Sequence, residues 1–276
     1  DMLCLYINNN PKTQLFTGKG LRLGGSSEVY KDNDSHFGDL SAIITENLPF
    51  WADFSSAPSM EVALMSEWET KMEAIIDETI NENITSLVLL THSNGGNVVR
   101  WILSNPTYDS RYPSIISTTS KVIALAPSSL GTPLADVATQ GNIFESTLGW
   151  LLGYNSDAVK QQQVSWMAYY NDNWLSGTSG RPTLPSTFKA VVGSDVDSAI
   201  WDSDSYCGGY QYQVALETTQ NWLDSCSDGF LECSSQSGAG TVWFKDKEKT
   251  QGSEPLSHHQ SRRDCFNLDT IIRNDI

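Results

Sequence analysis

Ser93 combines the residue type of a nucleophile with a local sequence that would expose one. Residues 86–100 read SLVLLTHSNGGNVVR, an apolar strand pattern that passes through a short turn into a helical pattern. A serine at the apex of such a turn is held on a strained backbone with its hydroxyl turned toward substrate. Gly95 and Gly96 would let the helix pack close behind it. The simpler interpretation is an ordinary turn in which Ser93 caps the helix; the strand–turn–helix context favours the catalytic one.

The helix after Ser93 also offers electrostatic stabilisation. A helix begins with backbone N–H groups that lack intrahelical partners and with the positive end of its dipole. The backbone N–H of Asn94 is therefore expected to stabilise an oxyanion that develops beside Ser93. His92 is interpreted as a structural residue of the turn and not as a base.

Three segments resemble the α/β-hydrolase superfamily, and within it the secreted bacterial lipases and esterases. Residues 91–96 (THSNGG) resemble the G-H-S-x-G-G elbow of these enzymes, with Thr91 in place of the first glycine. Residues 126–136 (APSSLGTPLAD) resemble the loop after the next strand, and residues 228–231 (DGFL) resemble the turn that carries the catalytic acid.

The resemblance implies a fold and its extent. We expect an α/β-hydrolase fold, in which a mostly parallel central sheet is flanked by helices, as a single domain over residues 1–276. Residues 137–185 match nothing in the superfamily and are expected to form a lid or cap insertion. The apolar segment 141–154 would cover the serine and open at a lipid surface. A helix packed permanently on the core is the alternative.

The resemblance places the general base late in the chain. A serine hydroxyl is a weak nucleophile at neutral pH and needs a base, and in this fold the order is serine, acid, histidine. Of the four histidines, only His258 and His259 follow the last predicted strand. Ser257 and Gln260 have the spacing of a capping box, with His258 at the helix start. His258 is the favoured base and His259 the alternative.

Asp228 fits the acid by its order in the chain and by its Asp-Gly turn. Asp195 and Asp197 are alternatives, because they closely follow another predicted strand. A second oxyanion donor comes from a His-Gly loop in the superfamily, and this sequence has INNN there instead. A backbone N–H near Asn9 is the candidate for that donor.

Strands and helices alternate along the chain, which predicts a parallel sheet built from βα units. Strands are expected at residues 2–7, within 42–54, and at 86–90, 121–125, 188–192 and 241–245. Helices are expected at residues 60–80, after Ser93, and at 262–272, where apolar residues recur at helical spacing.

The charge balance and the cysteines restrict partners and compartment. With 17 basic and 33 acidic residues the net charge is −16, which disfavours nucleic acid as a partner. Cys4 lies in an apolar run and is expected to be a buried free thiol. The other four cysteines are expected to form two disulfides, with Cys207–Cys226 and Cys233–Cys265 as the predicted pairing among three. Disulfides would indicate a secreted protein.

These patterns predict hydrolysis of carboxylic esters, of lipids or other hydrophobic esters, through a Ser-His-Asp triad. No zinc spacing is present, the acidic residues between Asp195 and Asp204 lack the spacing of a calcium loop, and no cofactor is expected. The partners would be the ester itself and, transiently, a lipid surface; the oligomeric state stays open. The alternatives are an acyltransferase or thioesterase with the same triad, or a non-catalytic binding module.

Overall fold

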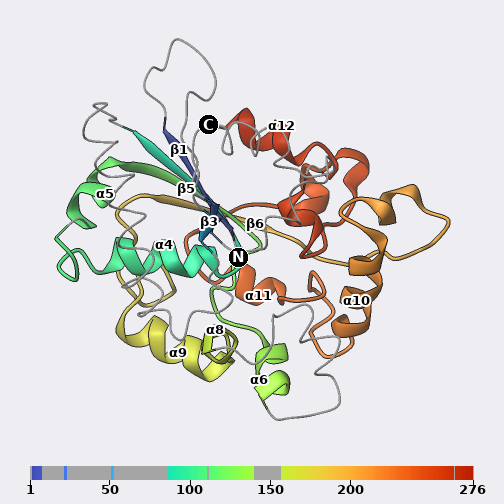
Figure 1. The fold of residues 1–276 in the computed structure, drawn as a ribbon, viewed down its shortest axis with the longest axis horizontal. Helices are drawn as coiled ribbons and strands as arrows, with labels where there is room; N and C mark the ends of the chain where they lie inside the picture. The colour runs from blue at the N-terminus through green and yellow to red at the C-terminus, as the bar shows by residue number, and fades with distance from the viewer. Residues whose placement is uncertain are drawn as a thin grey trace.

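A five-stranded sheet in the order β1-β4-β5-β6-β7 organises the protein. The computed structural model (Figure 1) describes residues 2–7, 22–23, 51–52, 86–110, 112–139, 157–263 and 265–275. The sheet consists of β1 (Met2–Ile7), β4 (Leu87–His92), β5 (Thr119–Leu125), β6 (Thr187–Val192) and β7 (Thr241–Lys245). A separate parallel pair consists of β2 (Arg22–Leu23) and β3 (Trp51–Ala52).

Helices occupy the connections between these strands. The α-helices are α4 (Gly95–Ser104), α5 (Tyr112–Thr118), α6 (Pro133–Thr139), α8 (Asp157–Gln161), α9 (Val164–Asn173), α10 (Tyr210–Gln220), α11 (Cys233–Gln236) and α12 (Leu268–Arg273). Short 3-10 helices are η3 (Ser203–Tyr206), η4 (Asp246–Glu248), η5 (Gln251–Ser253) and η6 (Gln260–Arg262).

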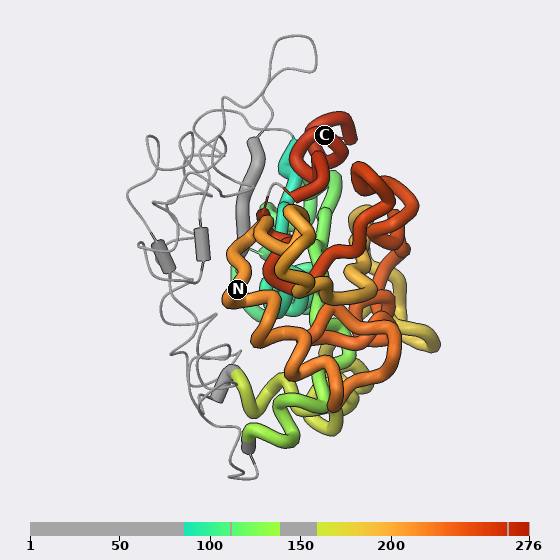
Figure 2. Tube along the Cα trace, turned by 90° about the vertical axis from the view of Figure 1, so that its right-hand side faces the viewer, coloured from blue at the N-terminus to red at the C-terminus, as the bar shows by residue number. Residues whose placement is uncertain are grey.

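The sheet is mostly parallel, as predicted. β4, β5, β6 and β7 run in the same direction, and β1 pairs antiparallel with β4. Since parallel strands end at the same edge of a sheet, the loops after β4, β5 and β6 meet there. Figure 2 shows the teal and green strands side by side, with the orange and red last third of the chain packed along them.

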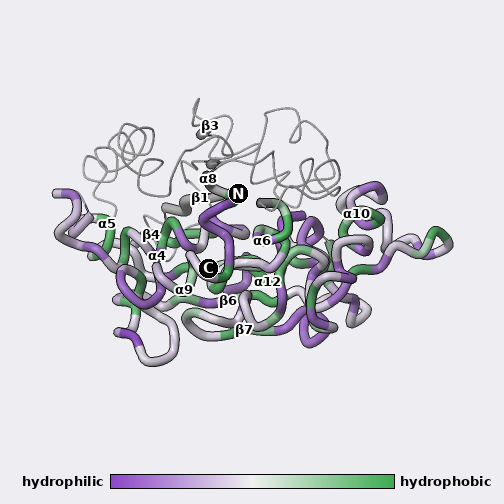
Figure 3. The backbone as a smooth tube through the Cα atoms, turned by 90° about the horizontal axis from the view of Figure 1, so that it is seen from below, coloured by the Kyte–Doolittle hydropathy of each residue, from purple (hydrophilic) through white to green (hydrophobic). Residues whose placement is uncertain are grey.

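Alternate residues of the strands face two different layers of core. Leu87 and Leu89 of β4 pack in one cluster with Val98 and Trp101 of α4. Their neighbours Val88 and Leu90 face the opposite cluster, which α12 covers with its buried Leu268 and Ile272. In Figure 3 the segments along α4 and α12 include green, hydrophobic stretches, whereas the outer loops at the left of the view are mainly purple. The two helices thus clamp the strand that leads to Ser93.

The final helix is shorter than predicted. The expected helix at residues 262–272 is wrong at its start, since α12 begins only at Leu268. Phe266 and Asn267 have φ values of 58° and 63°, and this left-handed backbone interrupts a helix. The predicted helix at 60–80, the lid segment 141–154 and the side chain of Cys4 lie outside the described residues.

Within the described ranges, no helix is long and apolar enough to cross a membrane.

Candidate active site

Ser93 lies at the apex of the turn between β4 and α4 with a φ of 54°. Its N–H donates to the carbonyl of Leu125 at 3.0 Å, which continues the pairing of β4 with β5, and its own carbonyl accepts from Gly96 at 3.1 Å. A Cβ at Gly96 would lie 3.1 Å from the Cβ of Pro127. The turn therefore needs a small residue there, as the sequence suggested. A left-handed serine at the end of a strand is the strained elbow from which a hydroxyl projects.

His258 and Asp228 complete a chain of hydrogen bonds to this serine. The Nε2 of His258 is 3.1 Å from the Oγ of Ser93, and its Nδ1 is 2.8 Å from Oδ2 of Asp228. A carboxylate only accepts, so Nδ1 carries the proton and Nε2 presents a lone pair to the hydroxyl. This is the tautomer that a general base needs. Asp228 is fully buried, and the imidazole is 13% exposed.

The carboxylate of Asp228 is fixed by its own turn. Its Oδ1 accepts from the N–H groups of Phe230 at 2.9 Å and Leu231 at 2.6 Å. Gly229 has a φ of 84°, and a Cβ there would lie 2.6 Å from a methyl of Val196. Phe230 and Leu231 also anchor the turn in a third apolar cluster with α6 and α10. Oδ2 is thereby aimed at His258.

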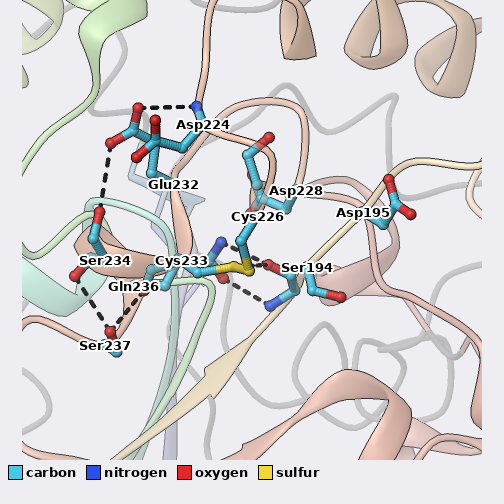
Figure 4. The surroundings of a disulfide bond; sticks show 12 residues. Ser194, Asp195, Asp224, Cys226, Asp228, Glu232, Cys233, Ser234, Gln236 and Ser237 are labelled. Atoms are coloured by element: carbon cyan, nitrogen blue, oxygen red, sulfur yellow. Dashed lines mark hydrogen bonds between the residues drawn. A yellow bond between two sulfur atoms is a disulfide. The ribbon is translucent and has the colours of Figure 1, made fainter.

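Two disulfides are present, but the predicted pairing is wrong. The structure joins Cys226 to Cys233 and Cys207 to Cys265. The cause is the acid loop, residues 226–233, which folds back on itself: Ser227 and Glu232 form an antiparallel bridge that brings its two ends together. Figure 4 shows this disulfide with Asp228 on the same loop. A seven-residue spacing around an Asp-Gly turn was the signal for this hairpin.

The base loop, residues 256–263, is held by the predicted capping box. The N–H of Ser257 donates to Oε1 of Gln260 at 3.0 Å, and the N–H of Gln260 donates to Oγ of Ser257 at 3.3 Å. The box lies just before the 3-10 helix η6, which begins at Gln260, and not at the start of the final helix. The N–H of His258 donates to the carbonyl of Asp228 at 2.8 Å, so the backbones of the acid loop and the base loop are directly joined.

His259 is turned away from this chain of hydrogen bonds. Its ring stacks on Tyr212 with centroids 3.8 Å apart, and its Nδ1 accepts from Arg262 at 2.8 Å. Burial first, and then Arg262 and Arg263, lower the pKa of His259 well below its usual value. Of the two candidate bases, the structure thus brings His258 to Ser93 and places His259 as a neutral packing residue.

The alternative acids serve other contacts. Asp195 accepts from its neighbour Val196 and from Gln220, and Asp197 accepts from Ala199 and Ser205. The carboxylate bonded to His258 is that of Asp228. In the described part of the chain, no three His, Cys, Asp or Glu side chains are grouped as ligands of a metal ion.

Asn94 stands at the start of α4, directly after the serine. Its side-chain Oδ1 accepts from Gln162 at 2.7 Å and from Asn97 at 3.2 Å, and all three residues are buried. These contacts fix the residue whose N–H is the candidate oxyanion donor. Gln162 directly follows α8, and nothing in its polar sequence pointed to the site. Asn9, the other candidate, lies outside the described residues.

A buried cation supports the elbow from behind. Arg100 of α4 is fully buried and forms no ion pair with a carboxylate among the described residues. Its guanidinium donates instead to oxygens of Asn97, Ser129, Asn171 and Ser176. Burial lowers the pKa of Arg100 to about 10, so it keeps its charge at neutral pH. This network ties α4 to the loop after β5 and to α9.

Several solved structures share this architecture. The mature form of the Bacillus licheniformis lipase BlEst2 aligns with a TM-score of 0.61 and 16% identity over 92% of this chain and 89% of the lipase. Its propeptide form aligns with a TM-score of 0.56 and 15% identity over 92% of this chain, which spans 49% of that longer structure. The metagenomic carboxyl esterase MGS0156 aligns with a TM-score of 0.52 and 13% identity over 98% of this chain and 83% of the esterase. The chain has the α/β-hydrolase fold. The predicted fold class is confirmed.

One sequence family also matches part of the chain. A profile of the GH3 family N-terminal domain matches residues 1–94. That match includes Ser93 but neither Asp228 nor His258, and most of it lies outside the described residues. No curated protein sequence matches the chain.

Proposed function

We propose that this α/β-hydrolase cleaves carboxylic esters, with Ser93 as nucleophile, His258 as general base and Asp228 as the acid that orients it. The observation that carries the proposal is the pair of hydrogen bonds from Ser93 to His258 and from His258 to Asp228, at 3.1 and 2.8 Å. A left-handed serine on a strand-to-helix turn supports the same role for Ser93. The structural neighbours, a lipase and a carboxyl esterase by name, favour esters as substrates.

The geometry suggests how each group would act. His258 would take the proton from the Ser93 hydroxyl as the oxygen attacks the ester carbonyl. The start of α4, with the N–H of Asn94, would stabilise the oxyanion of the tetrahedral intermediate. His258 would then give the proton to the leaving alcohol, and Ser93 would hold the acyl group. A water molecule activated by the same imidazole would release the acid and restore the serine.

We further propose a hydrophobic acyl group and an extracellular location. The insertion carries α9, and α9 packs against the elbow, where Met167 lies against Asn97. Elsewhere on α9, Trp166 is 48% and Tyr169 49% exposed, so this helix offers aromatic surface to solvent. Two disulfides support an oxidising compartment.

The test is ester hydrolysis by purified protein with Ser93→Ala, and with Ser117→Ala as a matched control on the exposed face of α5. We expect hydrolysis of p-nitrophenyl butyrate and octanoate, a loss of about 10⁴-fold or more in kcat/KM for Ser93→Ala, and no change for Ser117→Ala. A fluorophosphonate should label the wild-type and Ser117→Ala proteins but not Ser93→Ala. Equal hydrolysis by folded Ser93→Ala would overturn the proposal. Product analysis with added alcohol separates hydrolysis from acyl transfer.

A further inference from the structure

His92 makes a contact that its role as a turn residue does not explain. The residue ends β4, precedes Ser93, and is 4% exposed. Its Nε2 lies 2.9 Å from the backbone carbonyl oxygen of His258, and the two imidazole rings are 4.6 Å apart between centroids. A carbonyl oxygen can only accept, so the Nε2 of His92 carries the hydrogen.

The surroundings of the other ring nitrogen, Nδ1, keep the imidazole of His92 neutral. Nδ1 is buried and has no hydrogen-bond partner within the described ranges. A second proton there would place a desolvated cation next to His258 and Arg262, and burial, followed by these two neighbours, lowers the pKa of His92 well below its usual value. His92 is therefore a fixed donor at neutral pH, with one hydrogen pointed at the carbonyl of His258.

This donor completes a second layer of bonds around the three site residues. The N–H of His258 donates to the carbonyl of Asp228 at 2.8 Å, and the carbonyl of His258 accepts from His92. The backbone of the base is thus held on one side by the acid loop and on the other by the strand that carries the nucleophile. Without His92, the acid loop would still hold the base, but the direct link from the base loop to the end of β4 would be lost.

We propose that His92 is a positioning residue, which holds the backbone of His258 so that the Nε2 of His258 stays within reach of the Ser93 hydroxyl. The inference rests on the proposed function of Ser93 and His258. An imidazole that must take up and return a proton is useful only while its distance to the serine is kept, and a misplacement of about 1 Å can cost about 10²-fold in rate. The linking hydrogen bond keeps that distance from outside the triad.

Three substitutions test the donor separately from the volume of the ring. In His92→Gln, the amide nitrogen is as many bonds from Cα as Nε2 is in histidine, so it can donate to the same carbonyl. His92→Leu fills much of the space but has no donor, and His92→Asn has a donor that is too short to reach. We expect kcat for p-nitrophenyl butyrate to fall about 10- to 100-fold in His92→Leu and His92→Asn with KM little changed. His92→Gln should recover most of that loss.

The outcomes separate this inference from the proposed function. Equal kcat in His92→Gln, His92→Leu and His92→Asn, whether high or low, would mean that the donor does not matter and would overturn the inference, while Ser93→Ala still reports on the triad. If His92→Leu does not fold, the comparison of His92→Asn with His92→Gln decides alone, since both keep a polar amide at the site. The rate of fluorophosphonate labelling of Ser93 should follow the same order as kcat.

Discussion

Ser93 and its two hydrogen-bonded partners, His258 and Asp228, are positioned by different kinds of structure. Ser93 is fixed by regular elements: β4, which leads to it, is buried on both faces, and α4, which leads away from it, is buried along nearly all of its length. Asp228 and His258 belong to the acid loop and the base loop, where few backbone groups are paired in regular elements. These loops are held by two disulfides, by the capping box of Ser257 and Gln260, and by side chains that bond the backbone.

The site thus has an elbow half, Ser93 with β4 and α4, and a loop half, the acid loop and the base loop, and different substitutions should disrupt each half. A strand and a helix pair their own backbone groups, so the elbow depends on the core around it, including the buried Arg100. A loop has no such internal pairing and needs cross-links. The Cys207–Cys265 disulfide lies close to the base loop, because a Cβ at the adjacent Gly208 would lie 3.3 Å from the ring of His259. The following experiments separate the two dependences.

The largest contrast is expected within the base loop itself. His258→Ala should lower kcat/KM by about 10⁴-fold or more, because it removes the imidazole that accepts the hydrogen bond of the Ser93 hydroxyl. His259→Gln should lower kcat/KM less than about tenfold, because His259 contacts Tyr212 and Arg262. Steady-state kinetics on an ester substrate measures both. A larger loss in folded His259→Gln than in His258→Ala would reverse the assignment.

Arg100→Met should destabilise the elbow half of the site and so lower the free energy of unfolding. The substitution removes the cation and leaves buried oxygens of Asn97 and Asn171 without their donor. We expect the free energy of unfolding to fall by about 3–5 kcal/mol, measured by urea denaturation. Arg273→Met is the matched control, because Arg273 pairs with Asp269 on α12 at 3.6 Å and is partly exposed. Equal losses in the two variants would contradict a special role for the buried network.

The two disulfides should affect stability and activity in opposite order. By loop closure alone, the Cys207–Cys265 link, with a separation of 58 residues, stabilises by about 4 kcal/mol, and the Cys226–Cys233 link, with a separation of 7, by about 2 kcal/mol. The shorter loop contains Asp228, so replacing Cys226 and Cys233 by serine should cost more kcat. Unfolding and kinetics on the two double variants provide the comparison. The same order in both measurements would show that the acid does not depend on its disulfide.

Acid should destabilise the fold through two buried histidines, His92 at the end of β4 and His259 in the base loop. His92 and His259 both have a folded pKa below the ordinary value of 6.5 because they are buried. Below pH 6.5 the unfolded chain binds protons that the folded chain does not, so the free energy of unfolding falls as the pH decreases, by up to about 1.4 kcal/mol per pH unit for each histidine. Above that pH both are neutral in either state and contribute nothing.

Urea unfolding at pH 7.5, 6.5 and 5.5 measures this slope. His259→Gln should flatten it by the share of one histidine, and His92→Gln by the share of the other. His36 lies outside the described residues and is left unchanged in every variant, so its contribution cancels in the comparison. A slope that neither substitution changes would contradict the assignment.

The sequence predicted the elbow half better than the loop half, for a physical reason. Hydrophobic runs and helical spacing determine β4 and α4, and both are visible in residues 86–100. The choice of His258 over His259 depends on the tertiary contacts of each ring, and the disulfide pairing depends on how the acid loop closes. The contacts of Gln162 and His92 join segments far apart in the sequence, so no local pattern could mark them. The roles of Ser93, Asp228 and His258 themselves stay a prediction until kinetics tests them.

The hydrogen bonds of the site also differ in how much of the chain must be assembled before they can form. The hydrogen bond between His258 and Asp228 joins residues 30 apart, whereas the one between Ser93 and His258 joins residues 165 apart. Contacts between distant residues form late and slowly, because the entropy of closing a long loop is lost before the contact can stabilise the chain. During refolding, Asp228 and His258 can meet before Ser93 joins them. Labelling of Ser93 by a fluorophosphonate should therefore lag behind the recovery of secondary structure. The rate at which labelling recovers would report when the contact between Ser93 and His258 forms.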